Sequence, residues 1–252
     1  MEFRKIFDTI PQKFDKYRPR YCDALFADLI AYAGIGAGKT VLELGPGTGQ
    51  ATEPILQTGC DYHAIELGEH LAAKMTENFG HYPNFSIVCD DFITHDFGNQ
   101  TFDMIYSAAT IQWIDEQIAF EKTFSLLKPG GVLAMMLTKS DYRTPNEALY
   151  EEIQKVYAAH WHPAEHYSRA GFGYANAVNH GYVDFERREY HGRREMTADE
   201  YVAFSGTHCD HIDIPEPHGS AFFEGLRNAV LAAGNRIVFE DTYVLMLTRK
   251  PR

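Results

Sequence analysis

Residues 41–50, VLELGPGTGQ, join the pattern of a buried strand to a turn that contains Gly45, Gly47 and Gly49. The nearly continuous apolar run at 40–44 is typical of a strand in a parallel sheet that helices cover on both faces. Glycine lets the backbone take positive φ or lets a bulky group approach closely. A strand that leads through such a turn into a helix is a general device for binding nucleotide-like ligands. The stretch therefore predicts an α/β fold with a ligand at the turn.

The chain on either side of this turn alternates strand and helix patterns. Short apolar runs predict strands at 62–67, 85–89, 102–107 and 131–137. Amphipathic or glycine-terminated runs predict helices at 21–34, 69–79 and 115–128. This order of elements predicts a doubly wound sheet.

The alternation breaks after about residue 140. Residues 141–182 are rich in His, Tyr and Asn, and we interpret them as an inserted cap. Residues 182–191 and 236–250 are expected to supply the last strands, the second of them antiparallel, with a helix at 196–206 between them. The predicted units are a core at 1–140 with an N-terminal helical lead-in, a substrate-side cap at 141–195 and a C-terminal completion of the sheet at 196–252.

Composition limits the function. The 252 residues are 45% hydrophobic, which is enough for a large core, and the longest apolar runs are too short to cross a bilayer. A formal net charge of −12 opposes nucleic acid, so we expect neither a nucleic-acid nor a membrane partner. The four cysteines lack C-x-x-C spacing, and we interpret them as reduced thiols of a cytoplasmic protein. The oligomeric state is left open.

Two ligand classes suit a glycine-rich turn of this kind. A dinucleotide site has the spacing G-x-G-x-x-G, whereas this chain has G-x-G-x-G. Glu43 precedes the first glycine by two residues, where it would repel a pyrophosphate and attract an ammonium group. A ligand that carries an ammonium group is therefore favoured over a dinucleotide.

These residues resemble the class I S-adenosylmethionine (SAM) dependent methyltransferases, whose first motif is [DE]-x-G-x-G-x-G. The later segments HAIELGEHL, VCDDF, FDMIYSAATIQWID and LLKPGG follow in the order of that family's motifs. The lead-in FDKYRPRYCDAL is similar to that of the small-molecule branch that includes trans-aconitate methyltransferase. The likeness covers residues 14 to about 138.

The resemblance implies a fold and an activity. The fold would be a Rossmann-like, doubly wound, seven-stranded sheet with the last strand antiparallel, plus an inserted helical cap. The activity would be methyl transfer from SAM to a small molecule, with S-adenosylhomocysteine (SAH) as the product. Pro54 departs from the pattern, because it lies in the helix expected after the turn and would bend it.

The resemblance also assigns residues to the methionine end of SAM. The three glycines of the turn would let the backbone lie against this end, and Glu43 would hold its ammonium group directly or through water. Ser107 and Ala108 would line the same arm through their backbones. Arg18, in the lead-in, could pair with the SAM carboxylate.

The nucleoside end of SAM would contact residues after the second and third strands. Glu66 ends its strand where a carboxylate can accept both ribose hydroxyls. Asp91 is the acid expected at the adenine amino group, with Phe92 against the ring.

Methyl transfer leaves little chemistry for catalytic groups. The donor is already activated, so the protein mainly aligns the acceptor and excludes water, and a base is needed only if the acceptor must lose a proton. No catalytic dyad is evident, and the catalytic residues stay unknown, with Trp113, His162 and His166 as candidates. The His-rich segments 160–166 and 208–211 lack the spacing of strong metal sites, so no metal is predicted.

The acceptor could be a carboxylate, a hydroxyl or an amine. A carboxylate is suggested by a group of arginines, because guanidinium groups bind carboxylates through two parallel hydrogen bonds. These arginines are Arg169, Arg187, Arg188, Arg193 and Arg194. Two other functions stay open, a SAM-binding partner subunit without catalysis and a nicotinamide-dependent oxidoreductase.

Overall fold

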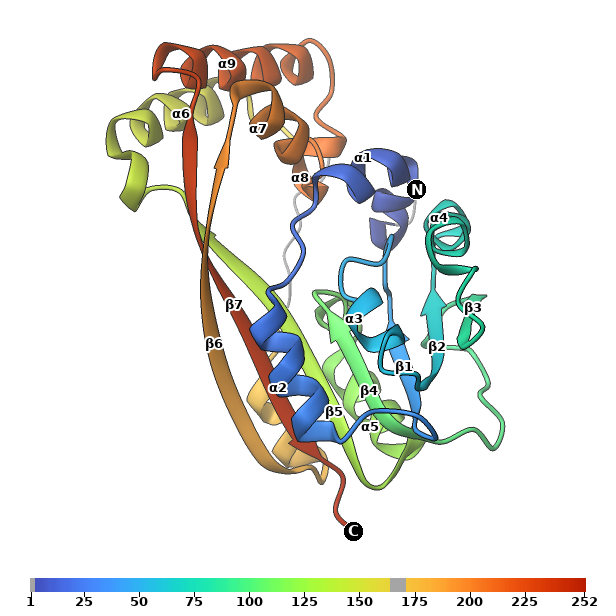
Figure 1. The fold of residues 1–252 in the computed structure, drawn as a ribbon. Helices are drawn as coiled ribbons and strands as arrows, with labels where there is room; N and C mark the ends of the chain where they lie inside the picture. The colour runs from blue at the N-terminus through green and yellow to red at the C-terminus, as the bar shows by residue number, and fades with distance from the viewer. Residues whose placement is uncertain (1–2, 164–170) are drawn as a thin grey trace.

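A computed structural model of the chain describes residues 3–163 and 171–252. One seven-stranded sheet runs through it in the order β3-β2-β1-β4-β5-β7-β6 (Figure 1). Strands β1 to β5 are parallel, and β7 is antiparallel to both β5 and β6. The predicted doubly wound sheet with an antiparallel last strand is therefore confirmed. The strands are β1 Thr40–Leu44, β2 Asp61–Glu66, β3 Phe85–Cys89, β4 Phe102–Ala108, β5 Leu127–Asp141, β6 Val183–Met196 and β7 Ile237–Arg249.

Helices cover both faces of the parallel part of the sheet. Helices α2, α3 and α4 pack on one face, and α5 packs with the 3-10 segment η4 on the other (Figure 1). Their bounds are α2 Asp23–Ala33, α3 Glu53–Leu56, α4 Glu69–Phe79, α5 Glu116–Leu126 and η4 Tyr174–His180. Because strand side chains alternate between faces, Val41 lies in the first core layer and Leu42 in the second.

A second lobe lies at one end of the long strands β5, β6 and β7 (Figure 1). Its core joins helices from both sides of the boundary expected at residue 195, with Ile153 of α6, Phe204 of α7 and Phe222 of α9 in one apolar cluster. The expected cap region also supplies β6, which belongs to the main sheet. The helices of this lobe are α6 Glu147–His160, α7 Ala198–Ser205, α8 Cys209–Ile212 and α9 His218–Ala232.

The N-terminal segment bridges the two lobes. It comprises η1 Phe3–Thr9 and α1 Pro11–Tyr17, and it passes between α4 and the second lobe (Figure 1). Helix α3 is a single turn with Pro54 in its first turn, where the missing N–H costs nothing, so the bend expected from Pro54 does not occur. None of the described helices is both long and apolar enough to span a membrane.

Candidate functional site

A cavity of about 550 Å³ lies at the carboxyl ends of the parallel strands. This volume is in the range of small-molecule sites, and the position is where open α/β sheets bind ligands, beside the reversal of strand order at β1 and β4. The wall is built from four parts of the chain. These are the N-terminal segment with Arg18, Pro19 and Tyr21, the glycine turn, the ends of β2 to β5, and the region of η4 and α8.

The three glycines of the turn have different surroundings, although all three have positive φ, of 57°, 63° and 98° in chain order. Gly45 and Gly47 line the cavity, whereas Gly49 does not. A methyl group on Gly45 would overlap the Thr110 side chain, and one on Gly49 would overlap the Phe79 ring of α4. Gly49 is thus required by the packing of α4 against the turn, and the ligand-facing role predicted for it is not supported by its position.

We expect Gly49→Ala to destabilise the fold by roughly 2–4 kcal/mol, because the methyl group adds overlap with Phe79 to the strain of positive φ. Gly34→Ala is the matched control. Gly34 also has positive φ, but no atom lies within 4 Å of the added methyl group, so its loss should stay near about 1–2 kcal/mol. Urea unfolding measures both variants. Equal stability of Gly49→Ala and the wild type would contradict this assignment.

Glu43 points away from the cavity. Its side chain is fully buried on the face of β1 that is turned away from the cavity, and it is not part of the cavity wall. Its Oε2 accepts hydrogen bonds from Thr52 Oγ1 at 2.6 Å, from Tyr106 OH at 2.6 Å and from Tyr62 OH. Burial raises the pKa of this carboxyl. The direct contact with an ammonium group is therefore not supported, and Glu43 instead holds the start of α3 from beneath the turn.

Glu66 is the carboxylate that faces the cavity from the strand ends. It lies at the end of β2, is 6% exposed and forms part of the wall. Its Oε2 accepts the Gly47 N–H at 2.9 Å, and its Oε1 accepts the Gly68 N–H at 3.0 Å. Burial raises the pKa of Glu66 to about 7, against the lowering effect of these backbone hydrogen bonds. The predicted position at the strand end is thus occupied by a preorganised acceptor that also fixes the turn.

Asp91 and Phe92 follow β3 and line the same cavity. Asp91 accepts two hydrogen bonds from Arg4, with Nη1 to Oδ1 at 3.1 Å and Nη2 to Oδ2 at 2.7 Å. These bonds lower the pKa of Asp91. The ammonium of Lys122 lies 5.2 Å from the centre of the Phe92 ring. No local pattern indicates Arg4, because its partner is 87 positions away in the chain.

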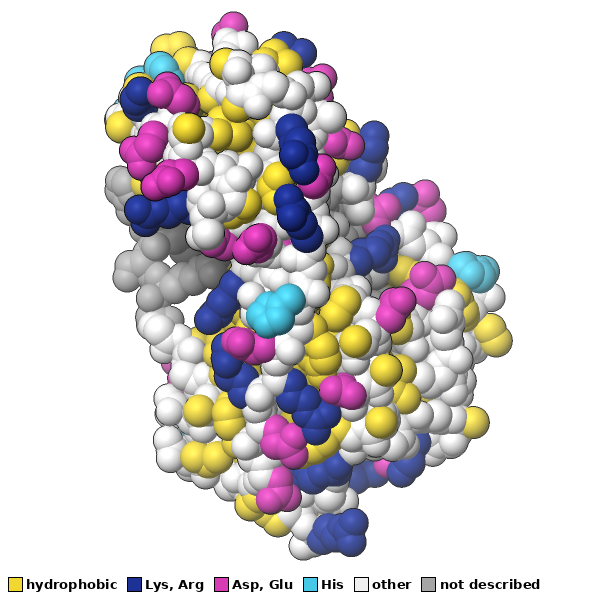
Figure 2. Space-filling model, turned by 60° about the vertical axis from the view of Figure 1, so that its left-hand side comes forward, with side chains coloured by type: hydrophobic (Ala, Val, Ile, Leu, Met, Phe, Trp, Pro, Cys, Tyr) yellow, Lys and Arg dark blue, Asp and Glu magenta, His cyan; other side chains and the backbone are white. Residues whose placement is uncertain are grey.

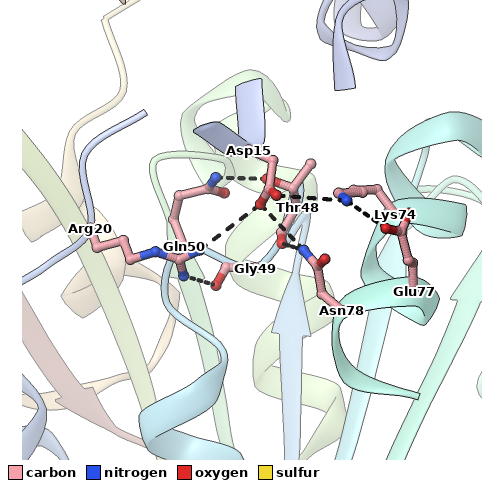
Figure 3. Close-up of polar contacts among 8 residues, drawn as sticks. All are labelled: Asp15, Arg20, Thr48, Gly49, Gln50, Lys74, Glu77 and Asn78. Atoms are coloured by element: carbon pink, nitrogen blue, oxygen red, sulfur yellow. Dashed lines mark hydrogen bonds and ion pairs between the residues drawn. The ribbon is translucent and has the colours of Figure 1, made fainter. Parts of the chain in front are cut away.

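Arg18 reaches the cavity because the N-terminal segment is fastened to the glycine turn and to α4. Asn78 donates to Asp15 Oδ1 at 3.2 Å and to the Thr48 carbonyl at 3.1 Å, and Arg20 donates to the Gly49 carbonyl at 3.1 Å (Figure 3). These contacts place Arg18 in the wall, where its Nη2 donates to the Thr207 carbonyl at 2.5 Å.

Ser107 is fully buried and is not part of the cavity wall. Its hydroxyl accepts the Ile111 N–H at 2.9 Å and thereby shapes the loop after β4. Ala108 and Ala109 do line the cavity, the second with a φ of 59°. Of the two residues assigned to this loop from the sequence, Ala108 thus borders the cavity and Ser107 does not.

The candidate catalytic residues lie in different places. Trp113 lines the cavity and contacts the Phe7 ring, with 6.1 Å between the ring centres. His162 is exposed, packs against His218 at 4.5 Å and is absent from the wall, so its predicted role has no support. His166 lies outside the described residues.

The His-rich segment 208–211 contributes the histidine that sequence reasoning did not select. His208 lines the cavity together with Asp210 of α8, whereas His211 is buried and held by Ser205 and Tyr157. Burial, together with nearby positive groups, lowers the pKa of His208 well below its usual value. Among residues 3–163 and 171–252, no three His, Cys, Asp or Glu side chains are placed to hold a metal ion.

The arginines that suggested a carboxylate acceptor are elsewhere. Figure 2 looks onto the β6 side of the molecule, where basic and acidic side chains alternate over the surface. None of the four described arginines lines the cavity, and Arg169 lies outside the described residues. The four described arginines therefore do not support a carboxylate acceptor, because each of them lies beside an acidic partner. The pairs are Arg187 with Glu189, Arg188 with Glu186, Arg193 with Glu195 and Arg194 with Asp241.

Comparison with known proteins gives a consistent result. Residues 42–135 match the family described as a methyltransferase domain. The chain is 26% identical over 160 residues to malonyl-[acyl-carrier protein] O-methyltransferase of Marinomonas sp. strain MWYL1, covering 62% of this chain and 56% of that protein. It is 37% identical over 65 residues to ribosomal RNA small subunit methyltransferase A of Dehalococcoides mccartyi strain CBDB1, covering 26% of this chain and 22% of that protein. The chain thus spans about half the length of the first relative and less of the second.

Solved structures share the fold. A putative type II methyltransferase from Anaeromyxobacter dehalogenans superposes with a TM-score of 0.67 and 17% identity, covering 94% of this chain and all of that one. Phosphoethanolamine N-methyltransferase 2 of Haemonchus contortus, solved with phosphomonomethylethanolamine and SAH, superposes with a TM-score of 0.60 and 17% identity, covering 100% of this chain and 61% of that one.

Proposed function

We propose that this protein, whose residues 42–135 match a methyltransferase domain, is a class I SAM-dependent methyltransferase that transfers the methyl group of SAM to a small-molecule acceptor. One observation carries the proposal. The glycine turn, Glu66 and Asp91 come from three successive strand ends and border one cavity, whose remaining wall comes from the N-terminal segment and α8. A cavity bordered by these strand ends and covered by the N-terminal segment and α8 suits a donor and an acceptor held together.

The residues present suit SAM, although Glu43 and Gly49 do not take part directly. A side chain at Gly47 would fill the space beside Phe14, so the backbone there can border a bound group closely. Glu66 would accept the ribose hydroxyls, and Asp91 with Phe92 would hold the adenine. Arg18 would pair with the carboxylate, and the backbone after Ser107 would border the methionine arm.

When bound, SAM supplies a methyl group on a sulfonium, which needs no further activation. The protein's own contribution is to orient the acceptor and to exclude water. Phe7 and Trp113 give the cavity an apolar side, and the N-terminal segment covers it. These residues act by positioning, which agrees with the absence of an evident catalytic dyad in the sequence.

The test is methyl transfer from tritium-labelled SAM to a small-molecule metabolite extract by the purified protein. We expect label in a small molecule and equal formation of SAH. Binding of SAH without transfer to any extract would favour a partner subunit without catalysis. Quenching of tryptophan fluorescence by NADH but not by SAH would favour the oxidoreductase.

A cytoplasmic location belongs to the same proposal, and none of the four cysteines forms a disulfide.

A further inference from the structure

The end of the cavity that the N-terminal segment covers, where Trp113 contacts Phe7, presents hydrogen-bond acceptors. Gln112 lies in the loop after β4, and its Nε2 donates a hydrogen bond to the Ala109 carbonyl at 2.9 Å. With the amide held in this orientation, Oε1 is buried and has no hydrogen-bond partner among the described residues. Gln112 is part of the cavity wall. A buried carbonyl oxygen without a partner is rare in folded proteins, so a ligand with an N–H or O–H group would complete it.

His208 is a second acceptor at this end. It lies at the N-terminal side of α8, with its ring 4.8 Å from the Phe204 ring and 5.1 Å from the His211 ring, centre to centre. No hydrogen bond to its ring nitrogens is found within residues 3–163 and 171–252. A cavity-lining imidazole in this state has a nitrogen lone pair available to a ligand.

The charged groups around His208 favour its neutral form. Arg18 of the N-terminal segment, His211 of α8 and Arg194 of β6 all disfavour a positive charge on it, in addition to burial. Asp210, the next residue but one, lines the cavity with a side chain that is 43% exposed, and its charge acts to raise the pKa of the neighbouring His211. These surroundings keep the imidazole in the neutral form that can take a proton, and they also make it a weaker base than an exposed histidine.

The same end provides little for a carboxylate. Within the described wall the cationic side chains are Arg4 and Arg18, and no lysine is present. Arg4 is engaged by Asp91, and Arg18, which also donates to the Thr207 carbonyl, is the group proposed to pair with the carboxylate of SAM. The acceptors at this end are thus not balanced by a cation that is available to an anionic substrate.

We infer that the methyl acceptor is an uncharged hydroxyl or amine, that Gln112 Oε1 accepts a hydrogen bond from it, and that His208 removes its proton. This inference rests on the proposed methyl transfer. The lone pair of the acceptor oxygen or nitrogen forms the bond to the methyl carbon, and the electron pair of the carbon–sulfur bond stays on sulfur. The acceptor proton moves to a ring nitrogen of His208 and then to solvent.

The first arm of the test is the chemistry of the product. Label transferred from tritiated SAM to the metabolite extract is treated with dilute base. We expect the label to stay in the product, as in an ether or an N-methyl compound. Volatile labelled methanol would indicate a methyl ester and overturn the inference while leaving the proposed function intact. No transfer to any extract would instead contradict the proposed function, and the inference with it.

The second arm compares the rates at which the wild type and variants of His208 form the same labelled product. We expect His208→Gln to lower the transfer rate by about 100-fold or more, as for loss of a general base, with SAH affinity by calorimetry unchanged. Added imidazole should restore activity to His208→Gly. His162→Gln is the matched control, since His162 lies away from the cavity, and it should transfer at the wild-type rate. Full activity of His208→Gln, or failure of imidazole to restore His208→Gly, would contradict a proton-accepting role.

Discussion

Replacement of Gly47 by Val is expected to abolish measurable binding of SAM and SAH. Gly47 lines the cavity with a φ of 63°, and an added Cβ would lie 3.0 Å from the Phe14 ring. The two branches of Val extend beyond that Cβ into the space that a bound ligand would use. The Gly47 N–H also donates to Glu66, so any shift of the backbone would disturb the carboxylate. Isothermal titration calorimetry measures the affinity directly.

The matched control is Gly98→Val. Gly98 has a φ of 57°, no atom lies within 4 Å of an added Cβ, and the residue is not part of the cavity wall. It therefore carries a similar backbone strain of about 1–2 kcal/mol without reaching the ligand. We expect this variant to bind SAH as the wild type does. A folded Gly47→Val protein with wild-type affinity would show that the ligand lies elsewhere.

Replacement of Glu66 by Ala should weaken SAM binding at least about tenfold, since a hydrogen bond to a charged acceptor contributes about 1.5–3 kcal/mol. Glu66 is buried in the wall and can accept from two hydroxyls in addition to its backbone donors. Glu69→Ala is the control, because this carboxylate is exposed in the first turn of α4. Calorimetry should give an unchanged affinity for the control. Equal affinity of both variants would remove Glu66 from the site.

The same carboxylate predicts a pH dependence. Burial raises the pKa of Glu66 to about 7, so the unliganded protein holds a proton there at lower pH. The hydroxyl-accepting form is the carboxylate, and protonation competes with binding. SAM should therefore bind about tenfold more weakly at pH 6 than at pH 8. Glu66→Gln should remove this dependence, and a wild-type affinity that is equal at both pH values would contradict it.

Local patterns predicted the parts of the fold that depend on local chemistry. The predicted helix at 69–79 has the observed bounds of α4, because its apolar residues recur at helical spacing and glycines flank it. The strand that ends at Glu66 was also placed correctly, because a short apolar run is typical of a buried strand. The resemblance assigned Glu66, Asp91 and Phe92 to one ligand, and the structure brings them to one cavity because parallel strands end at one edge of a sheet.

The surroundings of Glu43, Gly49 and the histidines depend instead on contacts between residues that are far apart in the chain. The sequence 41–44 does not indicate which face of β1 meets the ligand, and Glu43 lies on the face with Tyr62 and Tyr106. Gly49 has the same spacing as its neighbours, yet its surroundings are set by Phe79 of α4. Similar reasoning applies to the histidines, because the packing of α8 brings His208 to the cavity while His162 stays on the surface.

The length of β6 was underestimated, because the strand expected at 182–191 runs on to Met196. Arginine and glutamate alternate along β6 and hide its pattern, since both of its faces carry charged side chains. Helix α6 was missed because the composition of 141–182 was interpreted as a whole, although Leu149 and Ile153 have the spacing of one helical face. Both elements are fixed by long-range partners, β7 for the strand and α9 for the helix.

A calorimetric titration of the wild-type protein with SAH tests the central claim most directly, because it needs neither the acceptor nor a variant. The cavity formed by the glycine turn, Glu66 and Asp91 predicts saturable binding with one SAH per chain, undisturbed by an excess of NADH. Absence of saturable SAH binding by the folded protein, or its displacement by NADH, would contradict the claim that this cavity is a SAM site.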